Sequence, residues 1–181
     1  MTTTDHDILN AIRLDADEGF RILLRKYKEP VYWHIRRLVV THDDALDATQ
    51  ETFIRIYRSI STFSAKGSFA GWIYRIATNE AMRILSHRQN MEVSLDSEES
   101  GTTLEAYADD YVDYSDAEAV LLQKAILTLP PKQQVAFNLR YFNDMSYEDI
   151  AQAIGSTASA AKVNYHLAKT RITDHLKKNI Q

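Results

Sequence analysis

One face of the segment 157–171 carries hydrogen-bond donors and cations but no carboxylate. The residues of this face are Ser159, Lys162, Asn164, His166 and Lys169. Protein–DNA contacts are made mostly by such groups, which donate to phosphate oxygens and to the edges of bases. The pattern therefore predicts a nucleic-acid-binding surface without indicating any reaction.

Two short helices joined by a tight turn would position that face. Ser146, followed by Asp149, has the pattern of a capping box, and Gly155 can take the positive φ at which a first helix ends. Thr157 can then cap a second helix. Its apolar residues recur with helical period and predict one buried stripe: Ala161, Tyr165, Ala168 and Ile172. This is the pattern of a helix-turn-helix, although an αα-hairpin with no role in DNA binding has the same local pattern.

Composition limits the other functions open to the chain. A length of 181 residues fits one large domain or two small ones, and a hydrophobic content of 45% is sufficient for a core. There is no cysteine, and the six histidines are scattered, so we expect no disulfide, no metal site and no cofactor. Neither a signal peptide nor an apolar run of membrane-spanning length is evident, which predicts a cytoplasmic protein.

Charge is distributed unevenly along the chain. The net charge is −4, but residues 91–118 contain 10 acidic and no basic residues. The flanking blocks are mildly basic, with 13 basic against 11 acidic residues in 1–90 and 8 against 4 in 119–181. For a nucleic-acid binder the local charge matters more than the total. We therefore predict domains at 1–90 and 116–181, joined by an acidic linker at 91–115 that either tethers them or lies in a partner's groove.

The apolar periodicity predicts an all-α fold. We expect helices over about 17–40, 42–60, 69–88, 117–128 and 131–142 in addition to the helix-turn-helix, and Pro30 is expected to kink or divide the first of them. Thr41 can cap the second helix, in which Leu46 and Tyr57 are expected to point inward.

Three motifs match one protein family. Residues 43–57 (DDALDATQETFIRIY) and 67–79 (GSFAGWIYRIATN) resemble region two of the sigma-70 family. Residues 129–151, which begin with LPPKQQ and end with YEDIA, resemble its region four. With no large domain between the two regions, the chain resembles an extracytoplasmic-function sigma factor.

The resemblance implies a function and partners. Such a protein binds the clamp of the largest subunit of core RNA polymerase and directs the enzyme to promoter DNA. Region four contacts the −35 element, and region two captures the −10 element as a single strand. Members of the family are commonly held inactive by an anti-sigma factor, often a membrane-bound one. The linker is expected to run toward the active-site channel of the polymerase.

The resemblance also implies three sets of site residues. The −35 set comprises Arg140, Ser159, Lys162, Val163, Asn164, His166, Leu167 and Lys169. The −10 set comprises Lys66, Gly67, Ser68, Trp72, Tyr74, Arg75, Asn79 and Arg83. The polymerase-binding set comprises Asp44, Asp47, Gln50, Glu51 and Arg55.

Two details qualify these assignments. Trp72 shares a helical stripe with Ile76, which favours core packing, so Tyr74 and Arg75 are the better candidates for DNA contact. Asn164 and Leu167 stand where the family often has arginine, which predicts weaker phosphate attraction and a different base preference.

Two other functions compete with this interpretation. A stand-alone helix-turn-helix regulator would use the first block to dimerise on a palindromic operator. An enzyme would need a phosphate-binding glycine loop or a nucleophile with its base, and the sequence contains neither pattern. His42 beside Asp43 and Asp44 is better explained as part of a helix N-terminus than as a metal cluster.

Overall fold

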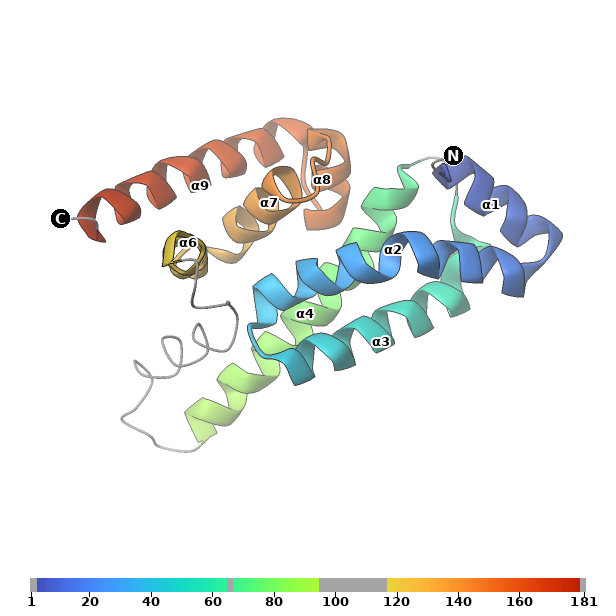
Figure 1. Cartoon of the computed structure of the whole chain (residues 1–181), viewed down its shortest axis with the longest axis horizontal. Coiled ribbons are helices and arrows are strands. Elements are labelled where there is room, and N and C mark those ends of the chain that lie inside the picture. The colour runs from blue at the N-terminus through green and yellow to red at the C-terminus, as the bar shows by residue number, and fades with distance from the viewer. Residues whose placement is uncertain (1–2, 65–66, 95–116, 180–181) are drawn as a thin grey trace.

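A computed structural model of the chain describes residues 3–64, 67–94 and 117–179, and these are organised as helices (Figure 1). The helices of the first half are α1 (Asp5–Leu14), α2 (Ala16–Val39), α3 (His42–Ser59) and α4 (Phe69–Ser94), with a short 3-10 turn, η1 (Ile60–Thr62), after α3. Those of the second half are α6 (Ala117–Leu127), α7 (Pro131–Tyr141), α8 (Tyr147–Ile154) and α9 (Ala158–Asn179). The all-α prediction is confirmed for the described part of the chain.

The first helix, α1, was not expected from the sequence. Thr4 and Asp7 form a capping box at its start, and Ile8 is fully buried. Its contact with α2 is very close at Gly19, where a Cβ atom would lie 2.3 Å from the backbone nitrogen of Ile12. Tyr27 of α2 adds a hydrogen bond of 2.6 Å to the Asp5 carboxylate. α1 is therefore packed against α2.

The long helix α2 continues through Pro30 as a single element, so the expected division there is wrong. Its buried residues pack with α3 and α4 around a core that includes Leu23, Ile35, Ile56 and Ile73. α4 ends at Ser94, six residues beyond the predicted end, so residues 91–94 of the predicted linker are helical. The rest of that linker lies outside the described residues.

Two polar connections join the helices of the first half. The side chain of Glu80 is only 4% exposed. Its carboxylate oxygens form ion pairs with Nε of Arg55 on α3 at 2.7 Å and with Nε of Arg83 at 3.0 Å. His34 of α2 lies 2.9 Å from the hydroxyl of Thr78 on α4, with a fully buried ring. Burial lowers the pKa of His34 to about 3, so this imidazole is neutral in the folded protein.

The second half surrounds a smaller core. Ala161, Ala168 and Ile172 are buried along one side of α9, and Tyr165 packs beside them, as the periodicity predicted. Phe137 of α7 stacks on Tyr165 with ring centroids 6.0 Å apart. Pro131 opens α7 at its first position.

The two halves pack against each other. α7 and α8 lie against α2 and α4, and α9 forms the outer edge of the molecule (Figure 1). Leu139, Met145, Ile150 and Ala153 of the second half belong to the same buried cluster as the core of the first half. The relative placement of the halves, which the sequence left open, is thus a direct contact between α8 and α4.

Candidate nucleic-acid interface

The helix-turn-helix has the predicted caps. The Ser146 hydroxyl accepts a hydrogen bond from the Asp149 backbone nitrogen at 3.1 Å, and Thr157 accepts one from Ala160 at the same distance. Gly155 ends α8 with φ 62° and ψ 50°, the left-handed conformation that a C-terminal glycine supplies. These local interactions fix the angle at which α9 leaves the turn.

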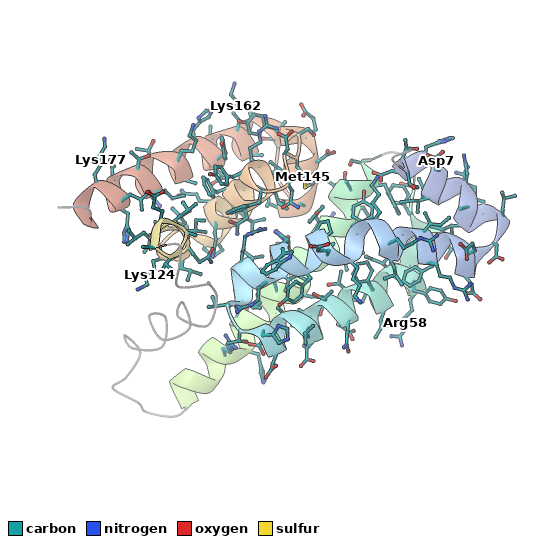
Figure 2. All side chains as sticks on the ribbon, viewed as in Figure 1. Asp7, Arg58, Lys124, Met145, Lys162 and Lys177 are labelled. Atoms are coloured by element: carbon teal, nitrogen blue, oxygen red, sulfur yellow. The ribbon has the colours of Figure 1, made fainter. Side chains whose placement is uncertain are left out.

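The outer face of α9 is accessible. Val163 is 57% exposed and Leu167 is 45% exposed, which is unusual for apolar side chains in a surface helix and suits contact with a thymine methyl group. Lys162 and Lys177 point away from the first half (Figure 2). Ser159, His166 and Lys169 are also exposed. Asn164 is half-buried and donates to the carbonyl of Ala160 at 3.0 Å.

Arg140 has a structural role within the second half. Its guanidinium donates to the carbonyl of Met145 at 2.8 Å and lies 5.2 Å from the ring centroid of Tyr147. It also lies 3.6 Å from the exposed carboxylate of Asp144. These contacts stabilise the turn between α7 and α8, and the side chain remains partly exposed at 35%.

The start of α4 holds the residues expected to capture the −10 strand. Lys66 lies outside the described residues. The Ser68 hydroxyl accepts from the backbone nitrogen of Gly71 at 3.1 Å, which caps the helix. Trp72 is partly exposed and packs with Phe63 and Phe69, at centroid distances of 5.2 and 5.8 Å, in line with the core packing that its helical stripe favoured.

Tyr74 does not face outward as expected. It is only 4% exposed, its ring meets that of His34 edge-on, and its hydroxyl accepts a hydrogen bond from the Asn143 amide at 2.9 Å. Burial raises the pKa of Tyr74 to about 12. The pattern along α4 could not reveal this, because the residues that contact Tyr74 come from α2 and from the other half of the chain.

Three polar residues follow along α4. Arg75 and Asn79 are exposed and line a cleft of about 390 Å³ between the halves. The opposite wall of this cleft comes from α7 and α8 and includes Lys132 and Gly155. Arg83, 60% exposed, is held by its ion pair with Glu80.

The expected polymerase-binding residues on α3 differ in whether their side chains form ion pairs within the protein. Asp44 pairs with Arg88 and accepts from the hydroxyl of Thr41, while Arg55 is held between Glu51 and Glu80. The charged groups of Asp44 and Arg55 are therefore paired with side chains of the protein itself. Asp47 and Gln50 are exposed and Glu51 is half-buried.

Two apolar residues of α3 were placed wrongly by the sequence pattern. Leu46 is 40% exposed and Tyr57 is 50% exposed, although both were expected inside. Leu46 lines a groove of about 550 Å³ between α2 and α3, which also includes Leu24, Arg25, Tyr32 and Gln50. The outward-facing leucine gives this helix face an apolar component that its charges alone did not predict.

Sequence analysis also missed Gln152 and Asn143. Gln152 of α8 accepts from the backbone nitrogen of Ser68 at 3.0 Å, and Asn143 donates to Tyr74. Neither amide was singled out by the sequence pattern, and only the packing of the two halves shows their role.

The described part of the chain contains neither a membrane-spanning helix nor a cluster of metal-ligating side chains. Across residues 3–64, 67–94 and 117–179 no helix combines the length and apolarity needed to cross a bilayer. The same residues contain no group of three or more histidine or acidic side chains placed to hold a metal ion.

Family comparisons match both halves of the chain. Residues 23–90 match the model for sigma-70 region 2, and residues 119–172 match that for sigma-70 region 4. The two matched segments contain most of α2, all of α3, most of α4 and most of the second half, and so include the −35, −10 and α3 residues described above.

Curated relatives are similar over most of the chain. The RNA polymerase sigma-H factor of Pseudomonas aeruginosa is 30% identical over 157 residues, covering 81% of this chain and 80% of that protein. The ECF RNA polymerase sigma factor SigW of Bacillus subtilis is 27% identical, covering 93% and 95%. SigE of Mycolicibacterium smegmatis is 29% identical over 87% of this chain, which spans 61% of that longer protein.

Solved structures share the fold. CnrH, in complex with the cytosolic domain of CnrY, superposes with a TM-score of 0.72 at 16% identity, covering 96% of this chain and 97% of CnrH. RpoE of Bartonella quintana, in complex with the anti-sigma factor NepR, gives 0.67 at 20% identity, covering 88% and 98%. Together with the sequence relatives, these matches show that the chain belongs to the sigma-70 family, in its extracytoplasmic-function group: it directs transcription initiation by RNA polymerase and catalyses no reaction of its own.

Proposed function

We propose that this sigma factor contacts promoter and polymerase through three separate surfaces. The −35 surface is the outer face of α9 with Arg140. The −10 surface is the start of α4 together with its outward residues Arg75 and Asn79. The clamp surface is the groove between α2 and α3 with the exposed polar residues of α3. The first belongs to the proposed domain 116–181 and the other two to the domain 1–90, with residues 91–115 between them.

The exposed outer face of α9 carries the proposal most directly. It combines cations, donors and two exposed aliphatic side chains on a helix whose entry angle is fixed by the caps of a helix-turn-helix. Lys162 and Lys169 would attract phosphates, while Val163 and Leu167 would meet thymine methyl groups. His166 and Ser159 add donors at the same face, and Asn164 offers an amide suited to adenine.

For the −10 surface, strand capture requires an unpaired base to find a stacking partner and a pocket. Unpairing costs a few kcal/mol, and stacking on an aromatic ring returns roughly 1–3 kcal/mol per base. Trp72 supplies the partly exposed ring, and Gly67 and Ser68 supply backbone that a strand can approach. Lys66, Asn79 and Arg83 complete the proposed set, whereas Tyr74 is buried with its hydroxyl bonded to Asn143 of the loop before α8.

The clamp surface combines charge with an apolar groove. Asp47, Gln50 and Glu51 offer polar contacts beside Leu46, while Asp44 and Arg55 hold the helix in position through their own ion pairs. An apolar centre surrounded by polar residues is the usual composition of a protein interface.

A reconstituted transcription assay tests these assignments. Core polymerase from the source organism, with and without this protein, would transcribe sheared genomic DNA, and the 5′ ends of the products would be sequenced. We expect start sites that share two sequence elements and appear only when the protein is present. A dimer that binds a palindromic operator without polymerase would instead indicate a stand-alone regulator.

We further propose that an anti-sigma factor, anchored in the membrane or soluble, holds this protein inactive in the cytoplasm. The support comes from the two solved structures of similar fold, which are complexes of RpoE with NepR and of CnrH with CnrY. Recovery of polymerase but no inhibitor with the tagged protein, under conditions where its promoters are silent, would contradict this proposal.

A further inference from the structure

We propose that the C-terminal part of α9 binds DNA phosphates outside the −35 element, through Thr173 and Lys177. The inference rests on the proposed function of the outer face of α9. It extends that function, because these phosphates flank the bases that the helix reads. Such a contact adds affinity and fixes the direction of the helix on the duplex without adding base preference.

One line of donors and cations runs along most of α9. Residues three or four apart lie on the same face of a helix, and the members of this line recur at spacings of four, three, four and four. All five are exposed, and they are named here the α9 stripe: Lys162, His166, Lys169, Thr173 and Lys177. The two ends of the stripe, Lys162 and Lys177, project to the same side of α9 (Figure 2).

The charge along the stripe suits an anionic partner. None of its three lysines forms an ion pair with an acidic side chain in the described part of the chain. Asp174 is the only acidic residue of α9, and at 3.6 residues per turn it lies about 100° around the helix from Thr173. A phosphate backbone that passes the C-terminal part of α9 is therefore attracted by the stripe and repelled on the side of Asp174.

Contacts with α6 and α7 hold the C-terminal part of α9 in place. Ile172 and Leu176 pack in the smaller core beside Ile126 of α6. Arg171 donates to the side-chain oxygen of Gln133 on α7 at 3.0 Å. The helix is therefore supported beyond the segment that matches sigma-70 region 4, which ends at residue 172. This support keeps the end of the stripe aligned with its beginning.

The stripe is longer than a major groove is wide. At a rise of 1.5 Å per residue, Lys162 and Lys177 are about 22 Å apart along the helix axis, whereas the groove is about 12 Å wide. A recognition helix contacts base edges with its N-terminal residues. Lys177 therefore lies past the bases that α9 reads, where the phosphate backbone is the part of the duplex that a lysine can reach.

Lysines at the end of a helix also stabilise the helix dipole, and this effect must be separated from DNA binding. Lys177 and Lys178 are both exposed in the last turn of α9, so the dipole affects them alike. Their faces differ, because Lys177 follows Thr173 by four residues and Lys178 follows Asp174 by four. Lys178 is therefore a matched control for Lys177.

Salt dependence of promoter binding tests the inference. Holoenzyme containing wild type, Lys177→Ala or Lys178→Ala would be titrated onto a labelled promoter over a series of salt concentrations. For Lys177→Ala we expect the slope of log affinity against log salt to fall in magnitude by about 0.9, which corresponds to one phosphate contact. Lys178→Ala should keep the wild-type slope. An unchanged slope for Lys177→Ala, or equal decreases in the two variants, would overturn the inference.

A second measurement locates the contact on the DNA. The phosphates on one side of the −35 element, and then those on the other side, would be replaced by uncharged methylphosphonates. On the fragment that lacks the contacted phosphates, Lys177→Ala should bind as tightly as the wild type, because the interaction is already removed. An equal effect of Lys177→Ala on both modified fragments and on the natural promoter would overturn the inference. An effect in cells but not with purified holoenzyme would indicate a protein partner and would also overturn it.

Lys162→Ala separates this inference from the proposed function. If that variant leaves the salt slope unchanged, the outer face of α9 does not bind the promoter, and the function proposed for it is wrong. If Lys162→Ala lowers the slope and Lys177→Ala does not, the −35 surface stands and its extension along α9 is wrong. Circular dichroism of each variant shows whether α9 is still folded.

Discussion

The side-chain oxygen of Gln152 lies 3.0 Å from the backbone nitrogen of Ser68, across a sequence separation of 84 residues. This bond joins the helix-turn-helix to the start of the helix expected to open the promoter. A neutral hydrogen bond contributes only about 1 kcal/mol net, so it can select an arrangement without making it permanent. The bond therefore adds orientation to an interface whose stability comes mainly from the buried apolar cluster shared by α4 and α8.

Replacing Lys162 with alanine should weaken promoter binding through loss of a phosphate contact. Lys162 is exposed on the outer face of α9 and has no described acidic neighbour that would neutralise it. The slope of log affinity against log salt should fall in magnitude by about 0.9, as expected for one phosphate contact. Fluorescence anisotropy of holoenzyme on a labelled promoter, over a series of salt concentrations, measures both quantities. Lys124→Ala on α6, which points away from α9 (Figure 2), should leave the slope unchanged.

Replacing Leu46 with aspartate should weaken binding to core polymerase. The side chain is 40% exposed, so the free protein should fold normally, but an ionised carboxylate would be buried at the clamp surface. We expect an affinity at least about tenfold lower, equivalent to about 1.4 kcal/mol. Titration of the labelled protein with core polymerase gives the dissociation constant, and circular dichroism shows whether the variant is folded. Arg58→Ala, at the exposed end of α3, is the matched control; wild-type affinity of Leu46→Asp would remove α3 from the interface.

Stability should fall at acidic pH because of His34. Its pKa is about 3 in the folded protein against about 6.5 for a solvent-exposed histidine, so between these values the unfolded state binds a proton that the folded state excludes. Stability is therefore unaffected by this group above about pH 7 and decreases as the pH falls through 6.5, by about 2 kcal/mol at pH 5. Urea unfolding of wild type and His34→Gln at pH 7.5 and 5 tests this. Between pH 7.5 and 5 the free energy of unfolding of the variant, which cannot titrate at this position, should fall by about 2 kcal/mol less than that of the wild type. Equal decreases in the two proteins would show that another group is responsible.

Gly155→Ala should destabilise the second half through its backbone alone. The φ of 62° is unfavourable for alanine, while nothing lies within 4 Å of the added Cβ. We expect a loss of about 1–2 kcal/mol in the free energy of unfolding, and a smaller loss for Gly155→Asn, since asparagine tolerates this conformation better. Chemical denaturation of the wild type and the two variants gives their free energies of unfolding. Equal costs for alanine and asparagine would mean that a lost contact, rather than the backbone conformation, sets the effect.

Local signals in the sequence predicted much of the fold. The caps at Ser146, Gly155 and Thr157 act within a few residues, so the chain reveals them without any tertiary information. In the same way, the helical periodicity of apolar residues predicted α2, α3, α4 and the helices of the second half. α1 was missed although Ile8, Leu9 and Ile12 form an apolar stripe, because three such residues in one short segment give only a weak periodic signal.

The errors in the candidate site share a physical cause. Periodicity identifies a helix face, but it does not say what covers that face. Tyr74 is buried against His34 of α2, with its hydroxyl bonded to Asn143 of the other half, and Leu46 is exposed because no described helix covers it. The pairing of Arg55 with Glu80 of another helix, which leaves its side chain 50% exposed, was likewise not visible in the pattern along α3. Side-chain partners distant in sequence are set by packing, which a pattern along one helix does not contain.

The absence of a side chain at Gly19 has a consequence for other members of the family. Since a Cβ atom there would stand 2.3 Å from the backbone of Ile12, a homologue with any larger residue at this site must hold its leading segment elsewhere or do without it. One column of an alignment would thus sort relatives into those that share this N-terminal arrangement and those that do not.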